Sequence, residues 1–191
     1  MHLLLFITFA PGWFSQGVFH PLQTPSHILL LLGLGLLIGQ QQRQVGSLLI
    51  FSFSVILGLV LNQTTSFDLN VSFSNGFEFS FELILLVLGL VISLLVIIKL
   101  PLPKLLMWLI AIVSGLALGF DSSPILIPGL GATSIYNWLA GAATSFIGVI
   151  ALTIMIAYIL NKLWNGIVLR VLASWIATSA IFVLTFMLLK N

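Results

Sequence analysis

His20 and His27 are the first candidates for ligands in this chain, because they enclose a short polar stretch that directly precedes the apolar run 28–32. Thr24 suits a helix N-cap and Pro25 the first helical position, so we expect a helix to begin there with His27 in its first turn. The helix dipole disfavours imidazolium at that place, and neutral imidazole is the form that binds a metal ion. His20 precedes a proline, so we expect extended backbone there, from which His20 folds back toward His27.

Two carboxylates are further candidates for a cation site. Glu82 opens an apolar run without other charges, and a carboxylate at the centre of a membrane helix costs about 2.5–3.5 kcal/mol on insertion scales. Asp121 ends another apolar segment. Roles without a metal ion stay open for both residues. Glu82 could be a hydrated residue in the first turn of a helix, where its charge interacts favourably with the helix dipole. Asp121 could belong to a turn in which Ser123 caps a short helix that begins at Pro124. Two histidines and two carboxylates together suit nickel, cobalt, zinc or copper.

The composition indicates which elements position these side chains. The chain has 191 residues, of which 60% are hydrophobic and 5% charged, whereas soluble domains carry about 25% charged residues. A soluble protein of this size cannot bury so much apolar surface. Six scattered Lys and Arg residues form no nucleic-acid patch, and the absence of cysteine excludes disulfides and thiolate metal sites. We therefore predict an all-α membrane protein, a polytopic bundle of six to seven transmembrane helices.

We expect one transmembrane helical domain over 1–191, with seven apolar segments near 3–19, 26–41, 46–62, 80–99, 103–120, 133–160 and 166–189. The first segment is interrupted at Pro11 and also resembles a signal-peptide core, so both interpretations stay open, with a retained helix favoured. Small residues, including Gly33, Gly35 and Gly39 and the pair Gly115 and Gly119, indicate close helix contacts more than a pore. Residues 68–81 alternate polar with apolar, as a short strand or a hairpin with its turn at 74–76 would, and we expect an amphipathic loop that lies against the outer surface.

Positive charge orients these segments. Arg43, Lys99, Lys104 and Lys162 lie in alternate connections, and Arg170 reaches the same side as Lys162. The opposite connections, 63–79 and 121–132, carry no Lys or Arg. We predict a multi-pass protein of the cell (cytoplasmic/inner) membrane with a cytoplasmic N-terminus if the first segment is retained.

This orientation gathers the four candidate ligands at the outer membrane face. The predicted metal site consists of His20, His27, Glu82 and Asp121.

The segment around the two histidines resembles the HupE/UreJ family of hydrogenase and urease accessory membrane proteins, which carry His-Pro-x-x-Gly-x-Asp-His at a helix start. Here His20, Pro21 and His27 match, while Thr24 replaces the glycine and Ser26 the aspartate. The Leu- and Gly-rich run 30–37, the helix opened by Glu82 and the stretch 136–144 are similar to later family segments. The family's histidines near 120–124 and in the next helix have no counterpart in this chain.

The resemblance covers most of the chain and implies a permease for nickel, cobalt or copper whose outer histidine and carboxylate site captures the ion. A non-transporting structural or assembly subunit of a larger membrane complex is the alternative, since several family ligands are absent. An axial haem or chlorophyll ligand at His27 is a third interpretation. No histidine beyond His27 serves a distant nucleophile, so we expect no enzyme. We expect no tightly bound cofactor, and as partners the lipid bilayer, a divalent metal ion and other membrane subunits, but no nucleic acid.

Overall fold

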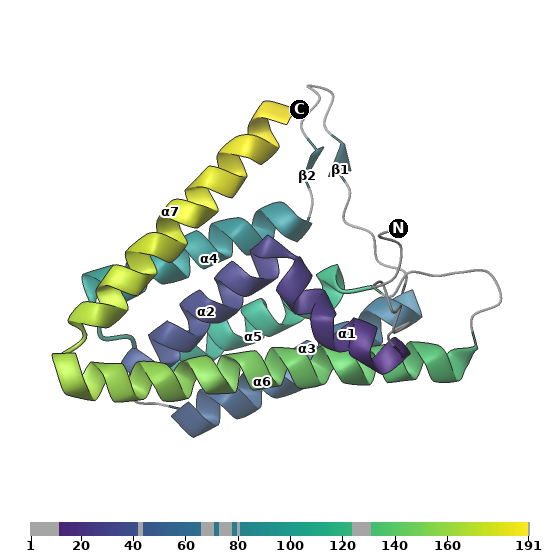
Figure 1. Cartoon of the computed structure of the whole chain (residues 1–191), viewed down its shortest axis with the longest axis horizontal. Helices are drawn as coiled ribbons and strands as arrows, with labels where there is room; N and C mark the ends of the chain where they lie inside the picture. Colours follow the sequence, from purple (N-terminus) through teal and green to yellow (C-terminus); the bar gives the residue numbers. More distant parts are fainter. Residues whose placement is uncertain are drawn as a thin grey trace, which may run out of the picture.

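The structure, a computed structural model, describes residues 12–41, 44–65, 71–72, 78–79, 81–123 and 131–190. In this part of the chain, seven helices form the body and two short strands lie beyond it (Figure 1). In chain order they are α1 (Trp13–Gln23), α2 (Pro25–Gln40), α3 (Gln44–Thr65), β1 (Val71–Ser72), β2 (Glu78–Phe79), α4 (Phe81–Ile98), α5 (Lys104–Asp121), α6 (Ala132–Trp164) and α7 (Ile167–Lys190). The predicted polytopic helical membrane fold is confirmed.

Five of the described helices, α3 to α7, are long and apolar enough to cross a membrane. Helices α1 and α2 pass the same test only together, and they meet at a bend of 75°. Most of the predicted segment 3–19 lies outside the described residues, so whether it forms a helix stays untested. The 11 residues of α1 span roughly 16 Å, too short to cross the hydrocarbon core.

Helix α2 lies at the centre of the bundle, between α4 and α6. Its side chains Leu30, Leu31 and Leu34 have no exposed surface. Its glycines allow the neighbouring helices to come close, because a Cβ on Gly35 would lie 2.6 Å from the Thr153 side chain of α6. Close helix packing, rather than a pore, is therefore the use of these small residues, as the sequence predicts.

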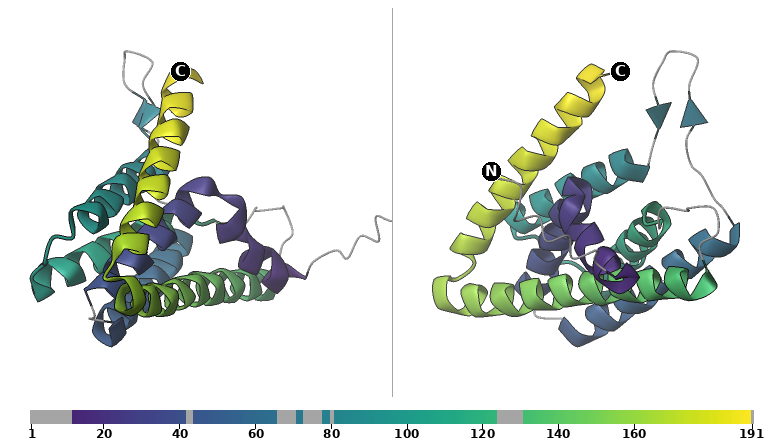
Figure 2. Two further views of the ribbon diagram at one scale, coloured as in Figure 1. Left: turned by 60° about the vertical axis from the view of Figure 1, so that its left-hand side comes forward. Right: turned by 45° about the vertical axis from the view of Figure 1, so that its right-hand side comes forward.

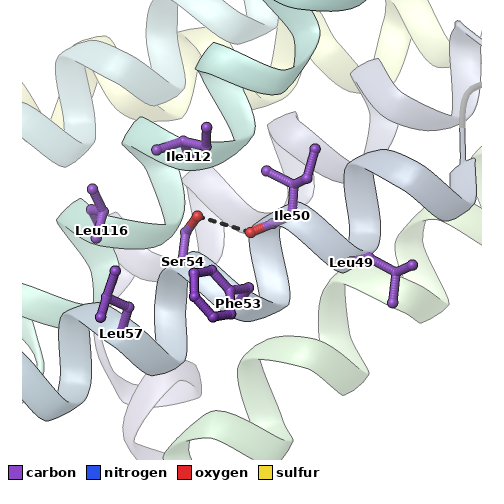
Figure 3. A pocket seen from close by; sticks show the side chains of 7 residues that line it. All are labelled: Leu49, Ile50, Phe53, Ser54, Leu57, Ile112 and Leu116. Carbon is purple, nitrogen blue, oxygen red and sulfur yellow. Dashed lines mark hydrogen bonds between the residues drawn. The ribbon is translucent and has the colours of Figure 1, made fainter.

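A second close pair, α3 and α5, completes the other side of the bundle. A Cβ on Gly119 would lie 2.7 Å from the backbone of Gly58, so the two helices touch almost backbone to backbone. The outer face of this pair carries an apolar groove of about 380 Å³ (Figure 3). The one polar side chain in the groove, Ser54, donates its hydroxyl to Ile50 O at 2.8 Å within its own helix, so the surface suits lipid acyl chains.

Polar contacts tie three helix connections together at one end of the bundle. Gln41 Nε2 donates to Leu100 O at 2.6 Å, and Asn161 Nδ2 donates to Gln40 O at 3.3 Å. Lys99 Nζ donates to Asn165 O at 3.3 Å. The α2–α3, α4–α5 and α6–α7 connections, in which the sequence places Lys and Arg, therefore lie side by side. That this end faces the cytoplasm stays a prediction.

The predicted hairpin is present between α3 and α4. Strands β1 and β2 pair antiparallel, with Val71 opposite Phe79. The predicted turn at 74–76 lies outside the described residues. The two strands lie beyond the helical body (Figure 1) and leave the core to the helices.

Candidate functional site

The site is built at the bend between α1 and α2. Helix α2 begins at Pro25 with Thr24 as its N-cap residue, so the predicted helix start is confirmed. The Thr24 hydroxyl makes no capping bond; it donates to His20 O at 3.3 Å and thereby joins the two helices. The Thr24 carbonyl accepts the backbone N–H of His27 at 3.1 Å, which fixes His27 in the first turn of α2.

The expectation of extended backbone at His20 is wrong, because His20 and Pro21 both lie within helix α1. Helix α1 packs along the first half of α6, as both views in Figure 2 show. Gly17 is the point of closest approach: a Cβ there would overlap the Trp138 carbonyl oxygen. This packing outweighs the local preference of a residue before proline. His20 thus reaches His27 from a helix rather than from a loop.

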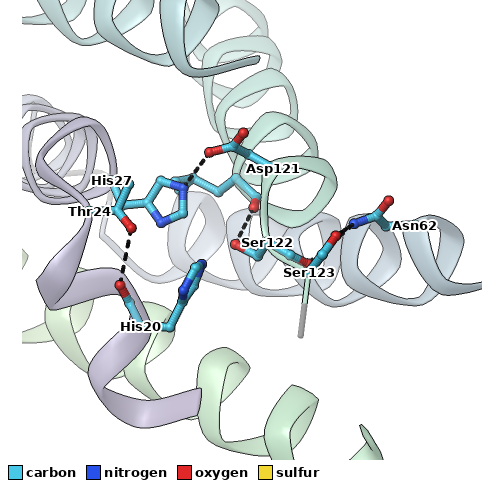
Figure 4. Close-up of polar contacts among 8 residues, drawn as sticks. His20, Thr24, His27, Asn62, Asp121, Ser122 and Ser123 are labelled. Carbon is cyan, nitrogen blue, oxygen red and sulfur yellow. Dashed lines mark hydrogen bonds and ion pairs between the residues drawn. The ribbon is translucent and has the colours of Figure 1, made fainter. Parts of the chain in front are cut away.

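His27 is joined to Asp121 across the bundle. Its Nε2 lies 2.8 Å from Asp121 Oδ2, as Figure 4 shows. The His27 side chain has no exposed surface, whereas that of Asp121 is 21% exposed. A carboxylate oxygen only accepts hydrogen bonds, so Nε2 of the imidazole carries the hydrogen and Nδ1 of a neutral ring keeps its lone pair. The contact therefore both holds α2 to α5 and fixes the tautomer of His27.

The two histidines form a contiguous pair, called here the histidine pair. Their ring centroids lie 5.3 Å apart at an interplanar angle of 72°. The rings are walled by aromatic side chains of α6, with Trp138 at 5.0 Å from His20 and Phe146 at 5.6 Å from His27. Within the described part of the chain, His20 Nε2 and His27 Nδ1 are buried and have no hydrogen-bond partner. Two buried imidazole nitrogens beside aromatic side chains are thus left for another group.

Glu82 makes no hydrogen bond or ion pair with the histidines or with Asp121 among the residues that the structure describes. It stands in the first turn of α4, next to Phe81, whose ring stacks on Phe120 of α5 at 6.0 Å. The beginning of α4 and the end of α5 are therefore neighbours. Among the residues that the structure describes, no three His, Cys, Asp or Glu side chains are arranged to hold a metal ion. The structure brings His20, His27 and Asp121 into successive contact without Glu82, and the four-residue metal site stays a prediction.

The surroundings of Asp121 differ from a simple turn. Asp121 is the last residue of α5, and Ser122 Oγ donates back to Leu118 O at 2.7 Å. Ser123 Oγ accepts a hydrogen bond from Asn62 Nδ2 at 2.8 Å. The predicted helix at Pro124 lies outside the described residues. Asp121 thus orients His27, a role that sequence reasoning did not consider for it.

Sequence reasoning also missed the aromatic walls of the site. Trp138 and Phe146 are eight residues apart and therefore share a face of α6, but nothing in the sequence assigns that face to the histidines. That Trp138 and Phe146 face the histidines can be inferred only once α1 is known to pack on α6.

Comparison of the chain with protein-family models, with curated proteins and with solved structures finds no match. The arrangement of the site must therefore carry the functional argument, since a fold alone does not define a function.

Proposed function

We propose that the chain is a divalent transition-metal permease of the nickel/cobalt type, similar to the HupE/UreJ family, and that the histidine pair captures the ion. The observation that carries the proposal is the pair of buried nitrogens, His20 Nε2 and His27 Nδ1, which have no hydrogen-bond partner among the residues that the structure describes. A buried polar atom without a hydrogen bond costs about 1–3 kcal/mol, and one cation bound to both nitrogens would remove both costs. Imidazole nitrogen is a preferred ligand of nickel, cobalt and copper.

Asp121 supports this use of His27. Metal-binding histidines commonly donate their second ring N–H to a carboxylate, which fixes the ring and raises its basicity. The 2.8 Å contact from His27 Nε2 to Asp121 Oδ2 has that form. Asp121 therefore acts in this proposal as the residue that positions His27, while the ion completes its coordination with water or with a further group.

Apolar side chains of α2 fill the core beyond the site. Leu30, Leu31 and Leu34 have no exposed surface, so an ion that crosses the bundle along α2 would meet hydrocarbon side chains. Two buried oxygens without a partner in the described residues, Ser47 Oγ and Gln40 Oε1, lie at the opposite end. Transport then requires α2 to move against its neighbours, and the bend at Thr24 is the place where such movement would begin.

Uptake of nickel, cobalt and copper by cells expressing the full chain tests the proposal. We expect uptake above an empty-vector control for at least one ion, and at least tenfold less uptake for His27→Ala, because one of the two nitrogens is lost. Thr178→Ala on α7, where the hydroxyl donates to Ser174 O within its own helix, is the control and should transport like the wild type. No uptake of any of the three ions by the wild type would reject the permease, and equal loss in both variants would reject this site.

A second candidate is the non-transporting structural or assembly subunit. The observation that favours it is that the described residues contain no cluster of three metal-ligating groups. Purification from native membranes in mild detergent distinguishes the two. A partner protein at stoichiometric yield, together with absent uptake, supports the subunit, whereas a lone chain that binds nickel or cobalt supports the permease.

A further inference from the structure

A groove lies at the end of the bundle that bears the Lys and Arg residues, and a function of this groove would be independent of metal transport. The groove has a volume of about 280 Å³ and lies between α4 and α7. It is called here the Arg170 groove and is lined by Ile97, Ile167, Arg170, Val171 and Ser174. The α7 residues recur at intervals of three or four and therefore form one face of the helix. The lining combines apolar walls with one cation and one hydroxyl.

Arg170 has unused hydrogen-bond capacity. Its Nε donates to Ile97 O at 2.8 Å, which holds the side chain along the end of α4. A guanidinium has five N–H donors, and within the described residues the Nη groups have no partner. The side chain is exposed, so these donors face outward from the helices. A planar fork of donors in this position suits a phosphate oxygen.

Further positive charge lies at the same end of the bundle, and the described residues there form no ion pair with a carboxylate. Lys99 Nζ donates to the Asn165 side chain at 3.4 Å in the α6–α7 turn, and Lys162 lies three residues before that turn. The ends of α4 and α6 and the start of α7 come together at the left of Figure 1. The sequence contains no Asp or Glu at 83–120 or 122–191. An anion from outside the chain, such as a phosphate group, would therefore suit these cations.

Trp164 marks this region as a membrane interface. Its side chain is 53% exposed beside the same turn, and tryptophan is enriched where lipid headgroups meet the hydrocarbon core. We propose that the Arg170 groove binds one acidic phospholipid, with the phosphate on the Arg170 guanidinium and an acyl chain along Ile97 and Val171. Basic pockets between membrane helices bind acidic headgroups through this combination of charge and apolar wall.

The test measures lipid selectivity of the full chain in detergent by native mass spectrometry. Phosphatidylglycerol and phosphatidylcholine of equal chain length are added in turn, and inorganic phosphate is the third arm. We expect the wild type to retain phosphatidylglycerol about fivefold better than phosphatidylcholine, the factor typical of one basic residue near an acidic surface. Inorganic phosphate at the same concentration should not displace it, because the acyl chain contributes to binding.

Three variants test whether the lipid selectivity arises in the Arg170 groove. Arg170→Gln should abolish the selectivity, while Lys104→Gln should retain it, because Lys104 lies over the Trp108 ring at the start of α5 and outside the groove. Ser174→Leu narrows the groove without changing its charge and should weaken lipid retention even if Arg170→Gln fails to fold. Equal retention of both lipids by the wild type would overturn the proposal. So would unchanged selectivity in Arg170→Gln, or displacement of the lipid by phosphate alone.

Discussion

Substitution of Gly17 by alanine tests whether the packing of α1 on α6 positions the site. The added Cβ would overlap the Trp138 carbonyl oxygen and lie 2.9 Å from Ala142 N, whereas ordinary contacts begin at 3.4 Å. Both neighbours are backbone atoms within α6 and cannot rotate away. Helix α1 must therefore move outward, and it carries His20, one turn later, away from its contact with Trp138.

The cost follows from two opposing effects. Overpacking of this kind costs about 1–3 kcal/mol, and alanine returns about 0.5–1 kcal/mol of helix propensity. The net loss is at most roughly 2.5 kcal/mol. We expect the upper half of this range, because both clashing neighbours are backbone atoms, and therefore a Tm lower by roughly 2–10 °C for a chain of this size. Since His20 is displaced as well, affinity for nickel or cobalt should fall about tenfold or more, as expected when the orientation of a ligand is lost.

Thermal unfolding in detergent, followed by tryptophan fluorescence, and isothermal titration with nickel measure the two effects on the same samples. Gly141→Ala should behave alike, because its Cβ would overlap the Phe14 carbonyl oxygen from the other side of the interface. Gly148→Ala is the matched control on α6: its Cβ meets nothing within 4 Å, so Tm and affinity should hold or rise slightly. If Gly17→Ala keeps wild-type Tm and affinity, the packing argument fails.

Two further predictions concern the carboxylate of Asp121 and the orientation of the chain in the membrane. Asp121→Asn should lower nickel affinity about ten- to hundredfold, because a neutral amide no longer fixes the tautomer and basicity of His27; titration calorimetry measures the loss, and an unchanged affinity would remove Asp121 from the site. The chain has no cysteine, so Gly131→Cys and Leu163→Cys, near opposite ends of α6, can each be labelled alone. A membrane-impermeant maleimide should label only Gly131→Cys in intact cells, and labelling of Leu163→Cys from outside would reverse the predicted topology.

Much of the fold is readable from the sequence, because in a membrane protein long apolar segments and backbone hydrogen bonding leave few alternatives to helices. Each of the last six predicted segments contains a helix, and the start of α2 at Pro25 follows from its Thr-Pro pair. The sequence predicts the end of α6 less accurately. The helix continues to Trp164, beyond the predicted residue 160, because Asn161 and Lys162 are compatible with a helix at the membrane surface. The left-handed backbone of Asn165 then ends it.

The site was readable only in part. The alternation of charged and uncharged connections correctly predicts that His27 and Asp121 lie at the same end of the bundle. This follows from the order of the helices, because successive spanning helices run in opposite directions. The conformation of His20 was not readable, because it depends on a glycine contact with a helix more than a hundred residues later. The orientation of Glu82, which forms no ion pair with the histidine pair in the described residues, likewise depends on how α4 is rotated in the bundle, and local sequence does not encode that rotation.

The length of α6 indicates how deep in the membrane the histidine pair would lie. Tyr136, 70% exposed, and Trp164, 53% exposed, stand near opposite ends of the helix, and the 28 residues from 136 to 164 rise roughly 42 Å. A bilayer with its headgroups measures about 40–45 Å, so an upright α6 would hold one aromatic anchor in each headgroup layer. Trp138 is then less than one turn below the nearer anchor. The imidazoles resting beside it would sit just beneath the water boundary, shallow enough for a hydrated ion to arrive before losing its shell.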